Sequence, residues 1–462
     1  MPADKRRSIP PGFWDLPPVR DALDRQDLGY LLELVTGHCG MSQHAVAAMA
    51  GMPQPQLSGY IRHSHKPTLD TISKVTDRLG IPTHARVRLG LARAAGTAGP
   101  RVRLSQVLAL AEHIGRTDDI SGLDAWREAA RAGKPEDTWA RLARVTHVDA
   151  PEELRAAERM SVRTRGFFLA AAKLPARLVI EALTYHVNDI GLLLDAIPDP
   201  GPRRELAKAS GEASYLVACC DVDLGDLPGA LSGLEVTAAI ARETGDAALT
   251  AITLDGHSHF RAFTGDHREA LALVGQGLDA AMTSGPPGTV THMRLRAAEE
   301  LINLGQTSRA VEMWEQAEAS YAATDLSTDR NWIRLWLSPD CFDSVKAVIY
   351  ASTGRTADAV PIARGIASRL AGALGKSDAV ALINAALALA TAGRPAEAAD
   401  TARQALQAAR AAEATGCMPR AHAVGEMIRQ HGKPASSVRR LIDELEATQR
   451  QLDGLQARNT AM

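Results

Sequence analysis

Amide, hydroxyl and basic side chains gather in one short stretch of the chain, between residues 43 and 66. A glutamine amide, such as that of Gln54, carries donors and an acceptor and can pair with the N6 and N7 edge of adenine. A serine hydroxyl can pair with a base or a phosphate, and basic side chains hold phosphates. The candidate residues of this stretch are Gln43, Gln54, Gln56, Ser58, Gly59, Tyr60, Arg62, His63 and Lys66. Their types predict contact with double-stranded DNA.

The charge distribution agrees with this prediction. The net charge of the whole chain is −2, yet residues 1–95 hold 12 Lys and Arg against 8 Asp and Glu, a net charge of +4. The remaining residues hold 40 and 46, a net charge of −6. A basic N-terminal part on an acidic body indicates that a polyanion binds at the N-terminal part.

Short helical patterns surround the candidate residues and would position them. We expect helices over residues 25–37, 43–50, 53–62, 69–79 and 83–94, with Pro82 ending the fourth. Ser42 and Thr68 stand where N-caps are needed, and Gly51 stands where a tight turn joins two helices. Two short helices joined in this way, with apolar residues such as Ala47 and Leu57 turned inward, predict a helix-turn-helix.

Residues 25–82 resemble the XRE/lambda-repressor-like family of helix-turn-helix domains. The matching residues are Met41, Ser42, Gln43, Ala47, Ala50, Gly51, Met52, Gln54, Leu57, Ser58, Ile61, Arg62, Lys66 and Pro67. The resemblance implies that the second helix lies in the major groove and that Gln43 and Gln54, each opening a helix, contact the DNA. Gly59 stands where many relatives carry a longer side chain. The alternative is a helix-turn-helix that serves only in packing or has lost DNA binding.

A second pattern recurs through the later part of the chain at intervals of 39–49 residues. The recurring position is a glycine, found at Gly225, Gly265, Gly305, Gly354, Gly393 and Gly432. Five residues after each glycine, and seven before it, stands Ala, Ser or Gly. Glycine adopts the left-handed turn that ends a helix, and small residues allow two helices to cross closely. The pattern therefore predicts stacked helical hairpins.

These hairpins resemble tetratricopeptide (TPR) repeats, most clearly in the segments that begin at Gly265, Gly305 and Gly393. Their period exceeds the roughly 34 residues of the standard repeat. The resemblance implies a right-handed solenoid whose first helices line a concave groove, which would hold an extended peptide or a small molecule or stay a solvated face. The polar residues expected in the groove are Glu212, Tyr215, Asp255, His259, His292, Glu299 and Asn303.

An insertion at residues 327–340 lengthens one of the intervals and contains two tryptophans. Trp332 and Trp336 are four residues apart, so a helix places them on one face. The two rings either fill the seam between neighbouring hairpins, as buried tryptophans usually do, or form an aromatic wall that faces the groove.

Other motifs give no chemistry that the sequence supports. Residues 370–377 end like a phosphate-binding loop, but Leu370 replaces the required glycine and the context is helical. His257 and His259 are two residues apart, on opposite sides of a helix, and His63 and His65 share that spacing, so neither pair suits one metal. The five cysteines show no metal spacing. We therefore predict no enzyme, no cofactor and no metal site.

The sequence also indicates the compartment. The first residues lack the apolar core of a signal peptide, and the longest uncharged stretch, residues 379–393, is too short to cross a bilayer. An odd number of cysteines, 5, argues against a disulfide framework. The expected location is cytoplasmic, without a membrane partner.

Together the patterns predict an all-α chain with an N-terminal five-helix helix-turn-helix domain and a TPR-like solenoid. The expected divisions are an arm (1–20), the DNA-binding domain (21–95), a linker (96–102), a helical connecting region (103–200) and the repeats with a C-terminal capping helix (201–462). The predicted function is sequence-specific transcription regulation, with an effector in the groove changing the spacing of two heads in a homodimer. The alternative is a TPR adaptor for protein partners with a vestigial head.

Overall fold

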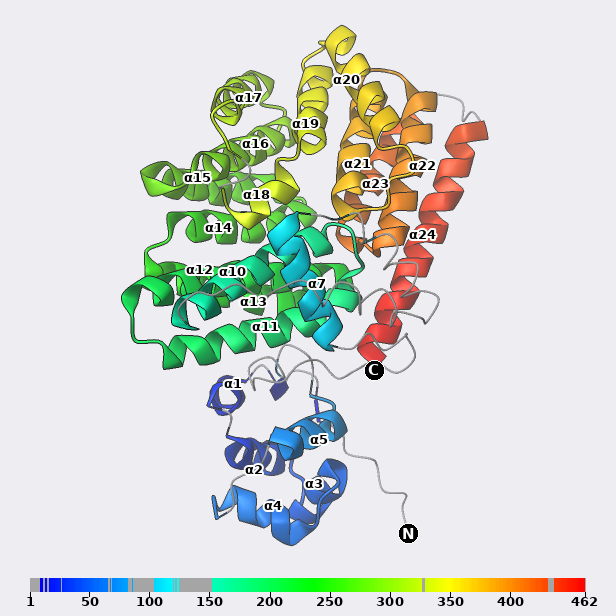
Figure 1. The fold of residues 1–462 in the computed structure, drawn as a ribbon. Coiled ribbons are helices and arrows are strands. Elements are labelled where there is room, and N and C mark those ends of the chain that lie inside the picture. Colours follow the sequence, from blue (N-terminus) through cyan, green and yellow to red (C-terminus); the bar gives the residue numbers. More distant parts are fainter. Residues whose placement is uncertain are drawn as a thin grey trace, which may run out of the picture. The chain divides into compact units, whose positions relative to one another are not determined.

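The structure is a computed structural model, and it describes residues 9–10, 13–14, 16–25, 27–64, 67, 69–81, 85, 104–118, 120, 123, 152–325, 329–430 and 436–461. The chain divides into two compact units, Met1–Gly96 and Thr97–Met462 (Figure 1). Every regular element in the described residues is a helix, which confirms the predicted all-α class.

The first unit contains five described helices. They are α1 (Pro17–Asp24), α2 (Leu28–His38), α3 (Gln43–Ala50), α4 (Gln54–Ile61) and α5 (Leu69–Leu79). Helices α3 and α5 have the predicted bounds, α2 begins three residues later than expected, and α4 is one residue shorter at each end. Most of the predicted helix at 83–94, the cap at Thr68 and the linker at 96–102 lie outside the described residues.

The predicted irregular arm at residues 1–20 was wrong for its last residues. Pro17 and Pro18 occupy the first turn of α1, where a missing backbone N–H costs no hydrogen bond. Just before that helix, Phe13 and Trp14 are 1% and 4% exposed and join the core of the first unit. The N-terminal segment therefore belongs to the packed domain from Phe13 onward.

In the described residues of the second unit, three helices precede the repeats. They are α7 (Leu104–Thr117), α10 (Glu152–Ala171) and α11 (Ala176–Ala196). Buried aromatic side chains of α10, such as Phe167 and Phe168, belong to the same apolar core as the first repeats. Helix α10 is therefore an integral part of the second unit.

The repeats are helical hairpins. They pair α12 (Pro200–Leu224) with α13 (Leu227–Thr244), α14 (Ala247–Phe263) with α15 (His267–Ser284), α16 (Pro287–Asn303) with α17 (Thr307–Tyr321), α19 (Pro339–Ser352) with α20 (Thr356–Arg369), α21 (Lys376–Thr391) with α22 (Pro395–Ala412), and α23 (Met418–Gln430) with α24 (Ser436–Ala461). The insertion forms α18 (Asn331–Trp336), and Thr415–Cys417 is a short 3-10 turn.

The marker glycines have the backbone conformation that the sequence pattern requires. Their φ angles are +76° at Gly225, +81° at Gly265, +70° at Gly305, +79° at Gly354 and +71° at Gly393. Gly432 lies outside the described residues. The alanine five residues after each of these five glycines is 0% exposed, because the two helices of each hairpin meet there.

The series of hairpins closes on itself. The backbone N–H of Lys376 donates to the carbonyl of Ala172 over 2.8 Å, and the hydroxyl of Thr415 donates to the carbonyl of Asp223 over 2.9 Å. Ion pairs join Lys173 to Asp378 at 2.6 Å and Arg177 to Glu413 at 2.8 Å. We call these contacts, between residues 172–177 or 222–223 and residues 375–378 or 413–416, the closing seam.

The last helix covers the end of the repeats. Val438, Leu441, Leu445 and Leu452 recur on one face of α24 and are at most 4% exposed. That face packs against α22 and α23. In its described part, α24 thus covers the apolar surface of the last repeats.

Candidate DNA interface and interior cavity

The first candidate site is the outer surface of α3 and α4. The Ser42 hydroxyl accepts a hydrogen bond from the N–H of Ala45 over 3.2 Å, which fixes the start of α3. Gly51, with φ of +67°, makes the turn between the two helices. Leu57 is 0% exposed and anchors α4 to the core, so the polar residues of the same helix face the other way. Pro53 and Pro55 lie at the N-cap and in the first turn of α4, where proline is tolerated.

The two glutamines that open these helices contact one another. Nε2 of Gln54 donates to Oε1 of Gln43 over 3.1 Å, and both side chains are half-buried. An amide nitrogen carries two N–H groups, so Gln54 keeps one N–H and its Oε1 for another partner. A neighbouring N–H and carbonyl oxygen form the pair that matches N7 and N6 of adenine. The hydrogen bond also limits the rotamers that Gln54 adopts.

The remaining residues of α4 divide into an exposed and a buried set. Gln56 is exposed, and its Nε2 donates to the hydroxyl of Tyr60 over 3.0 Å. Ser58 is half-buried. Gly59 and Tyr60 are both buried, and Tyr60 is 6% exposed within the core of the unit. The expectation that these two residues face the DNA directly is corrected: their positions in the helix turn them toward α2, and they support the exposed residues from beneath.

The basic candidates follow α4. Arg62 is exposed, and its Nε donates to the carbonyl of Ser58 over 3.2 Å, which leaves its two terminal nitrogens for other acceptors. His63 has a φ of +53°, and its Nδ1 lies 3.8 Å from the carboxylate of Asp27, the N-cap of α2. Lys66 lies outside the described residues.

The second candidate site is a cavity of about 210 Å³ inside the second unit. Its lining comes mainly from the first helix of each hairpin, α12, α14, α16, α19 and α21, with contributions from α18 and α23. A single water needs roughly 10–15 Å³, so this cavity has room for a molecule larger than a few waters. The cavity lies on the helices that were expected to line the groove, and it is partly open to solvent.

Six of the nine residues predicted for the groove line this cavity: Tyr215, Asp255, His259, His292, Glu299 and Trp336. They come from four different helices, α12, α14, α16 and α18, so the repeat pattern brought together residues up to 121 positions apart. The inward positions taken from the TPR resemblance thus fit the longer hairpins of this chain for most of the expected residues.

The other three predicted groove residues lie elsewhere. Glu212 is 5% exposed and is bonded to Arg330 at 3.0 Å and to Asn331, because the insertion folds back onto α12. Asn303 is exposed at the last position of α16. Trp332 is 0% exposed and packs with its ring 6.2 Å from that of Tyr215. The two tryptophans thus divide between the alternatives, since Trp332 fills a seam and Trp336 lines the cavity.

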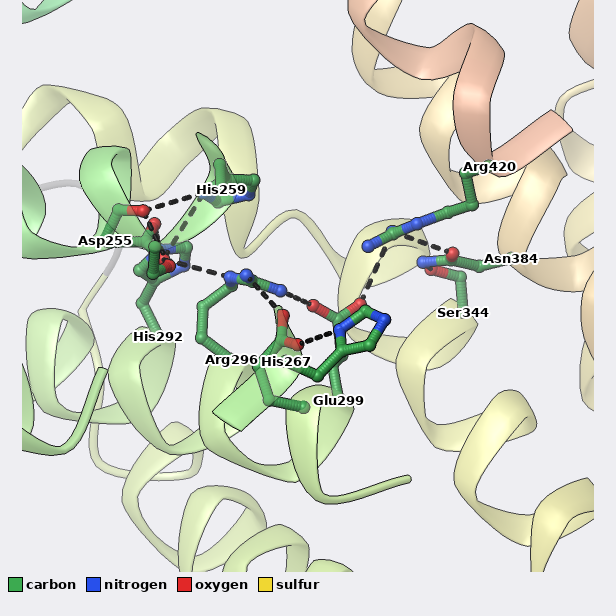
Figure 2. A network of polar contacts seen from close by, with 11 residues as sticks. Asp255, His259, His267, His292, Arg296, Glu299, Ser344, Asn384 and Arg420 are labelled. Carbon is green, nitrogen blue, oxygen red and sulfur yellow. Dashed lines mark hydrogen bonds and ion pairs between the residues drawn. The ribbon is translucent and has the colours of Figure 1, made fainter. Parts of the chain in front are cut away.

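A network of charged side chains crosses the cavity wall (Figure 2). Asp255 receives hydrogen bonds from Nε2 of His292 and from Nε of Arg296, both over 2.9 Å. Arg296 also pairs with Glu299 and, over 2.9 Å, with Glu300.

The network continues to the later hairpins through Arg420. Its guanidinium lies 3.5 Å from the carboxylate of Glu299 and donates to Oδ1 of Asn384 over 3.1 Å. The Asn384 amide in turn donates to the hydroxyl of Ser344 over 3.1 Å. One connected set of polar contacts therefore joins α14 and α16 to α19, α21 and α23.

The network fixes the charge of its members. Burial by itself raises the pKa of Asp255, but His259, Arg296 and His292 outweigh it and hold that pKa well below its ordinary value. Burial likewise lowers the pKa of Arg296, and the three carboxylates around it, Asp255, Glu299 and Glu300, reverse this and raise it. Asp255 and Arg296 thus both remain ionised at neutral pH.

Sequence reasoning missed several lining residues. Arg296, Lys376, Asn384 and Arg420 were not expected in the groove, although Lys376 was noted in the segment that resembles a phosphate-binding loop. That segment follows helix α20, and Lys376 forms an ion pair with Asp223 at 2.5 Å. Only the tertiary closure of the solenoid brings Lys376 to Asp223, so no local pattern could reveal the contact.

The cavity also contains thiols, which burial makes unreactive. Burial raises the pKa of Cys219 and of Cys341 to about 11 and that of Cys417 to about 12. A thiol in that state is not a nucleophile at neutral pH.

In the part of the chain that the structure describes, no group of three or more His, Cys, Asp and Glu side chains is arranged to hold a metal ion. None of the described helices is both long and apolar enough to cross a bilayer.

Comparison with known proteins identifies the first unit. The helix-turn-helix family matches residues 33–84. No curated protein matches the chain. Two solved structures show similarity. Bacillus thuringiensis PlcR, in complex with the peptide PapR7 and DNA, is 12% identical over 64% of this chain and 95% of its own, with a TM-score of 0.29. The TPR domain of P58(IPK) is 15% identical over 94% of this chain and 96% of its own, with a TM-score of 0.21.

Residues 33–84 thus form a helix-turn-helix domain of the XRE type, and the second unit is a solenoid of TPR-like helical hairpins. The matched segment contains α3, α4 and α5 and the turn at Gly51.

Proposed function

We propose that this protein is a sequence-specific transcription regulator that binds DNA through α3 and α4 and senses an effector in its solenoid. The observation that carries the proposal is the pair Gln54 and Gln43, joined by a 3.1 Å hydrogen bond at the start of two helices that meet at a tight turn. The pair presents one amide N–H and one carbonyl oxygen of Gln54 in a fixed orientation, as recognition of adenine in the major groove requires.

The neighbouring residues complete the interface. Gln43, Gln56 and Ser58 offer further polar groups on α3 and α4, and Arg62 and His63, which follow α4, add groups that bind phosphates. Lys66 follows in the sequence and adds a positive charge. Gly59 and Tyr60 act indirectly, since the Tyr60 side chain is buried in the core of the unit and its hydroxyl accepts the hydrogen bond of Gln56.

The solenoid supplies the regulation. An effector that fits one curvature of the hairpins better than another shifts the protein toward that curvature by its difference in affinity. The Glu299–Arg420–Asn384 contacts bridge the earlier and later hairpins, so an effector in the cavity meets the groups that set their separation. In a homodimer such a shift would change the distance between two DNA-binding units, whose half-sites lie about 34 Å apart.

The test is genomic DNA binding by the full-length purified protein at increasing salt. We expect selective retention of a few fragments, with an affinity that falls linearly on a log–log plot against salt concentration as counterions are released. Retention of no fragment above the non-specific background would overturn the proposal and favour a TPR adaptor. The mass of the protein–operator complex would show whether two copies bind one operator.

A further inference from the structure

The cavity is enclosed by covalently distant parts of the chain. The closing seam joins residues 172–177 to residues 375–378 and 413–416 through two ion pairs and a backbone hydrogen bond. An open solenoid would present a groove that an extended peptide follows past several repeats. Here the seam completes a ring of helices around a cavity of about 210 Å³, below the roughly 300–1,000 Å³ of pockets for drug-sized ligands. The geometry favours a small occupant.

Most of the wall is apolar. Leu234, Phe260, Leu295, Val380, Ile383 and Trp336 line the cavity. They come from four different helices and the insertion, so apolar surface faces the interior from several sides. The main favourable contribution to the binding free energy of a ligand is therefore the removal of its own apolar surface from water.

The charged side chains that line the cavity form ion pairs with one another. Three carboxylates line the cavity, those of Asp223, Asp255 and Glu299, and so do three strong bases, those of Arg296, Lys376 and Arg420. Ion pairs join Lys376 to Asp223 at 2.5 Å, Arg296 to Asp255 at 2.9 Å and Arg420 to Glu299 at 3.5 Å. A ligand with a net charge would find no free counter-charge among these paired groups, and placing that charge against the apolar wall is costly.

His259 offers an uncharged acceptor to a molecule in the cavity. Nδ1 of His259 lies 2.9 Å from the backbone carbonyl of Asp255, and since a carbonyl only accepts, Nδ1 carries the proton. Nε2 is then an acceptor in the neutral ring. Burial and the Arg296 guanidinium lower the pKa of His259, despite the opposing effect of Asp255, so the ring stays neutral at neutral pH. The His259 side chain is 40% exposed, so it is accessible to a molecule in the cavity.

We propose that the effector of this solenoid is a small, uncharged and largely apolar molecule that carries a hydroxyl group, which donates to Nε2 of His259. This inference rests on the proposed function and narrows its effector to one chemical class. The apolar wall selects the body of the molecule, the matched ion pairs select against a net charge, and the closing seam limits its size.

The experiment uses displacement of the small neutral dye 1-aminoanthracene from the full-length protein. The competing probes are octan-1-ol, the isomeric ether 1-methoxyheptane, octanoate, octylamine and a hydrophobic heptapeptide. We expect 1-aminoanthracene to bind with enhanced fluorescence and octan-1-ol to displace it at about five- to tenfold lower concentration than the ether, the effect of one hydrogen bond. Octanoate, octylamine and the heptapeptide should displace it less well still.

Variants connect the result to the cavity. His259→Leu should remove the preference for octan-1-ol over the ether and retain dye binding. Val380→Trp should fill the cavity and lower dye binding at least tenfold, whereas Val236→Trp, the same change at a position that is 44% exposed, should leave it unchanged. If Val380→Trp fails to fold, His259→Trp, at a more accessible position of the same wall, provides the filling variant.

Several outcomes would overturn the inference: no dye binding, dye binding that neither filling variant reduces, or stronger displacement by octanoate, octylamine or the heptapeptide than by octan-1-ol. Genomic DNA retention measured on the same samples separates this result from the proposed function. Selective DNA retention without the expected displacement pattern would support the proposed transcription regulator and refute the proposed class of effector. The expected displacement without DNA retention supports a ligand-binding cavity in a protein that is not a regulator.

Discussion

Gly29 of α2 lies against the backbone of Tyr60 in α4, so close that a Cβ atom at position 29 would come within 2.2 Å of the Tyr60 carbonyl oxygen. Real Cβ atoms do not approach an oxygen so closely, and the partner is backbone that cannot rotate away. The absent side chain of Gly29 therefore determines how near α4 sits to the core, and with it the position of Gln54 at the start of that helix.

Gly29→Ala should accordingly displace α4. We expect a loss of about 1–3 kcal/mol in the free energy of unfolding, the usual cost of overpacking, together with weaker DNA binding. Urea unfolding and DNA titration of the full-length variant measure the two effects. Gly37→Ala is the matched control in the same helix, since nothing lies within 4 Å of its added Cβ, and it should be neutral or stabilising by up to about 1 kcal/mol. Equal effects at the two positions would contradict the packing argument.

Substitutions of Gln54 and Arg62 should weaken DNA binding in different ways. Gln54→Ala removes the group assigned to a base, so the affinity for the preferred operator should fall by about 1–3 kcal/mol while non-specific binding is retained. Arg62→Ala removes a phosphate contact, so binding to all sequences should weaken alike and the salt dependence should become shallower by about one unit of slope. Binding titrations at several salt concentrations distinguish the two, and identical losses on all sequences for both variants would refute base reading by Gln54.

The local features of both units were predictable from the sequence, because each depends on residues close together in the chain. The turn at Gly51 and the cap at Ser42 follow from residue types within one helix end. The marker glycines, such as Gly265, follow from one repeated backbone requirement. Most inward positions could be found for the same reason, since a helix face is fixed by spacing.

The features that depend on distant contacts could not be predicted. No local pattern indicates that Lys376 meets Asp223, 153 residues earlier, or that the closing seam turns a groove into a cavity. Glu212 was expected in the groove but forms an ion pair with Arg330 instead. This contact likewise depends on how the insertion folds back onto α12. Gly59 and Tyr60 were misplaced because a short helix with few apolar residues gives a weak indication of its buried face.

The marker glycines offer a direct test of the repeat. Gly305→Ala forces an alanine into a φ of +70°, which should lower the free energy of unfolding by about 1–2 kcal/mol even though no atom lies within 4 Å of the added Cβ. Gly275→Ala, in the middle of α15 and equally free of contacts, should instead stabilise by about 0.5–1 kcal/mol. Thermal and urea unfolding measure both, and a destabilisation of the same size at Gly275 would show that the backbone angle is not the cause.

A buried histidine predicts how stability depends on pH. His186 is 0% exposed with its Nε2 2.8 Å from the Thr164 hydroxyl, and burial, followed by the charge of Arg163, lowers its pKa from 6.5 to about 3. Between these values the unfolded chain binds the proton and the folded protein does not. The contribution of neutral His186 is therefore complete above pH 6.5 and is lost as the pH falls toward 3.

His186→Gln should flatten that dependence. We expect the free energy of unfolding of the unmodified protein to fall by up to about 1.4 kcal/mol per pH unit in the window below pH 6.5 because of this one group, and the variant to fall correspondingly less. Urea unfolding at pH 8 gives the packing cost of the substitution, since the histidine is then neutral in both states. Parallel curves for the two proteins between pH 6.5 and pH 4 would contradict the assignment.

The ion pair between Lys376 and Asp223 lies at the boundary of the closing seam and the cavity. Burial opposes the charge of Lys376, but Asp223 and then the thiol of Cys219 raise its pKa above the ordinary value. Asp223 is 7% exposed, so Lys376→Met leaves a buried carboxylate without its cation. We expect the single variant to lose about 3–5 kcal/mol of unfolding free energy, and the double variant Lys376→Met with Asp223→Leu to lose clearly less.

Urea unfolding of the four proteins of this cycle yields the coupling between the two residues. Arg450→Met is the control, because Arg450 and Glu446 form an ion pair at 3.5 Å with side chains 70% and 62% exposed, and its loss should cost at most about 1 kcal/mol. A phosphate-binding role for the same lysine predicts a different result, namely nucleotide binding by the unmodified protein that Lys376→Met abolishes. If the ion pair is the role of Lys376, the protein retains no nucleotide, and the double variant is more stable than the single one because neither charge is then left unmatched in the interior.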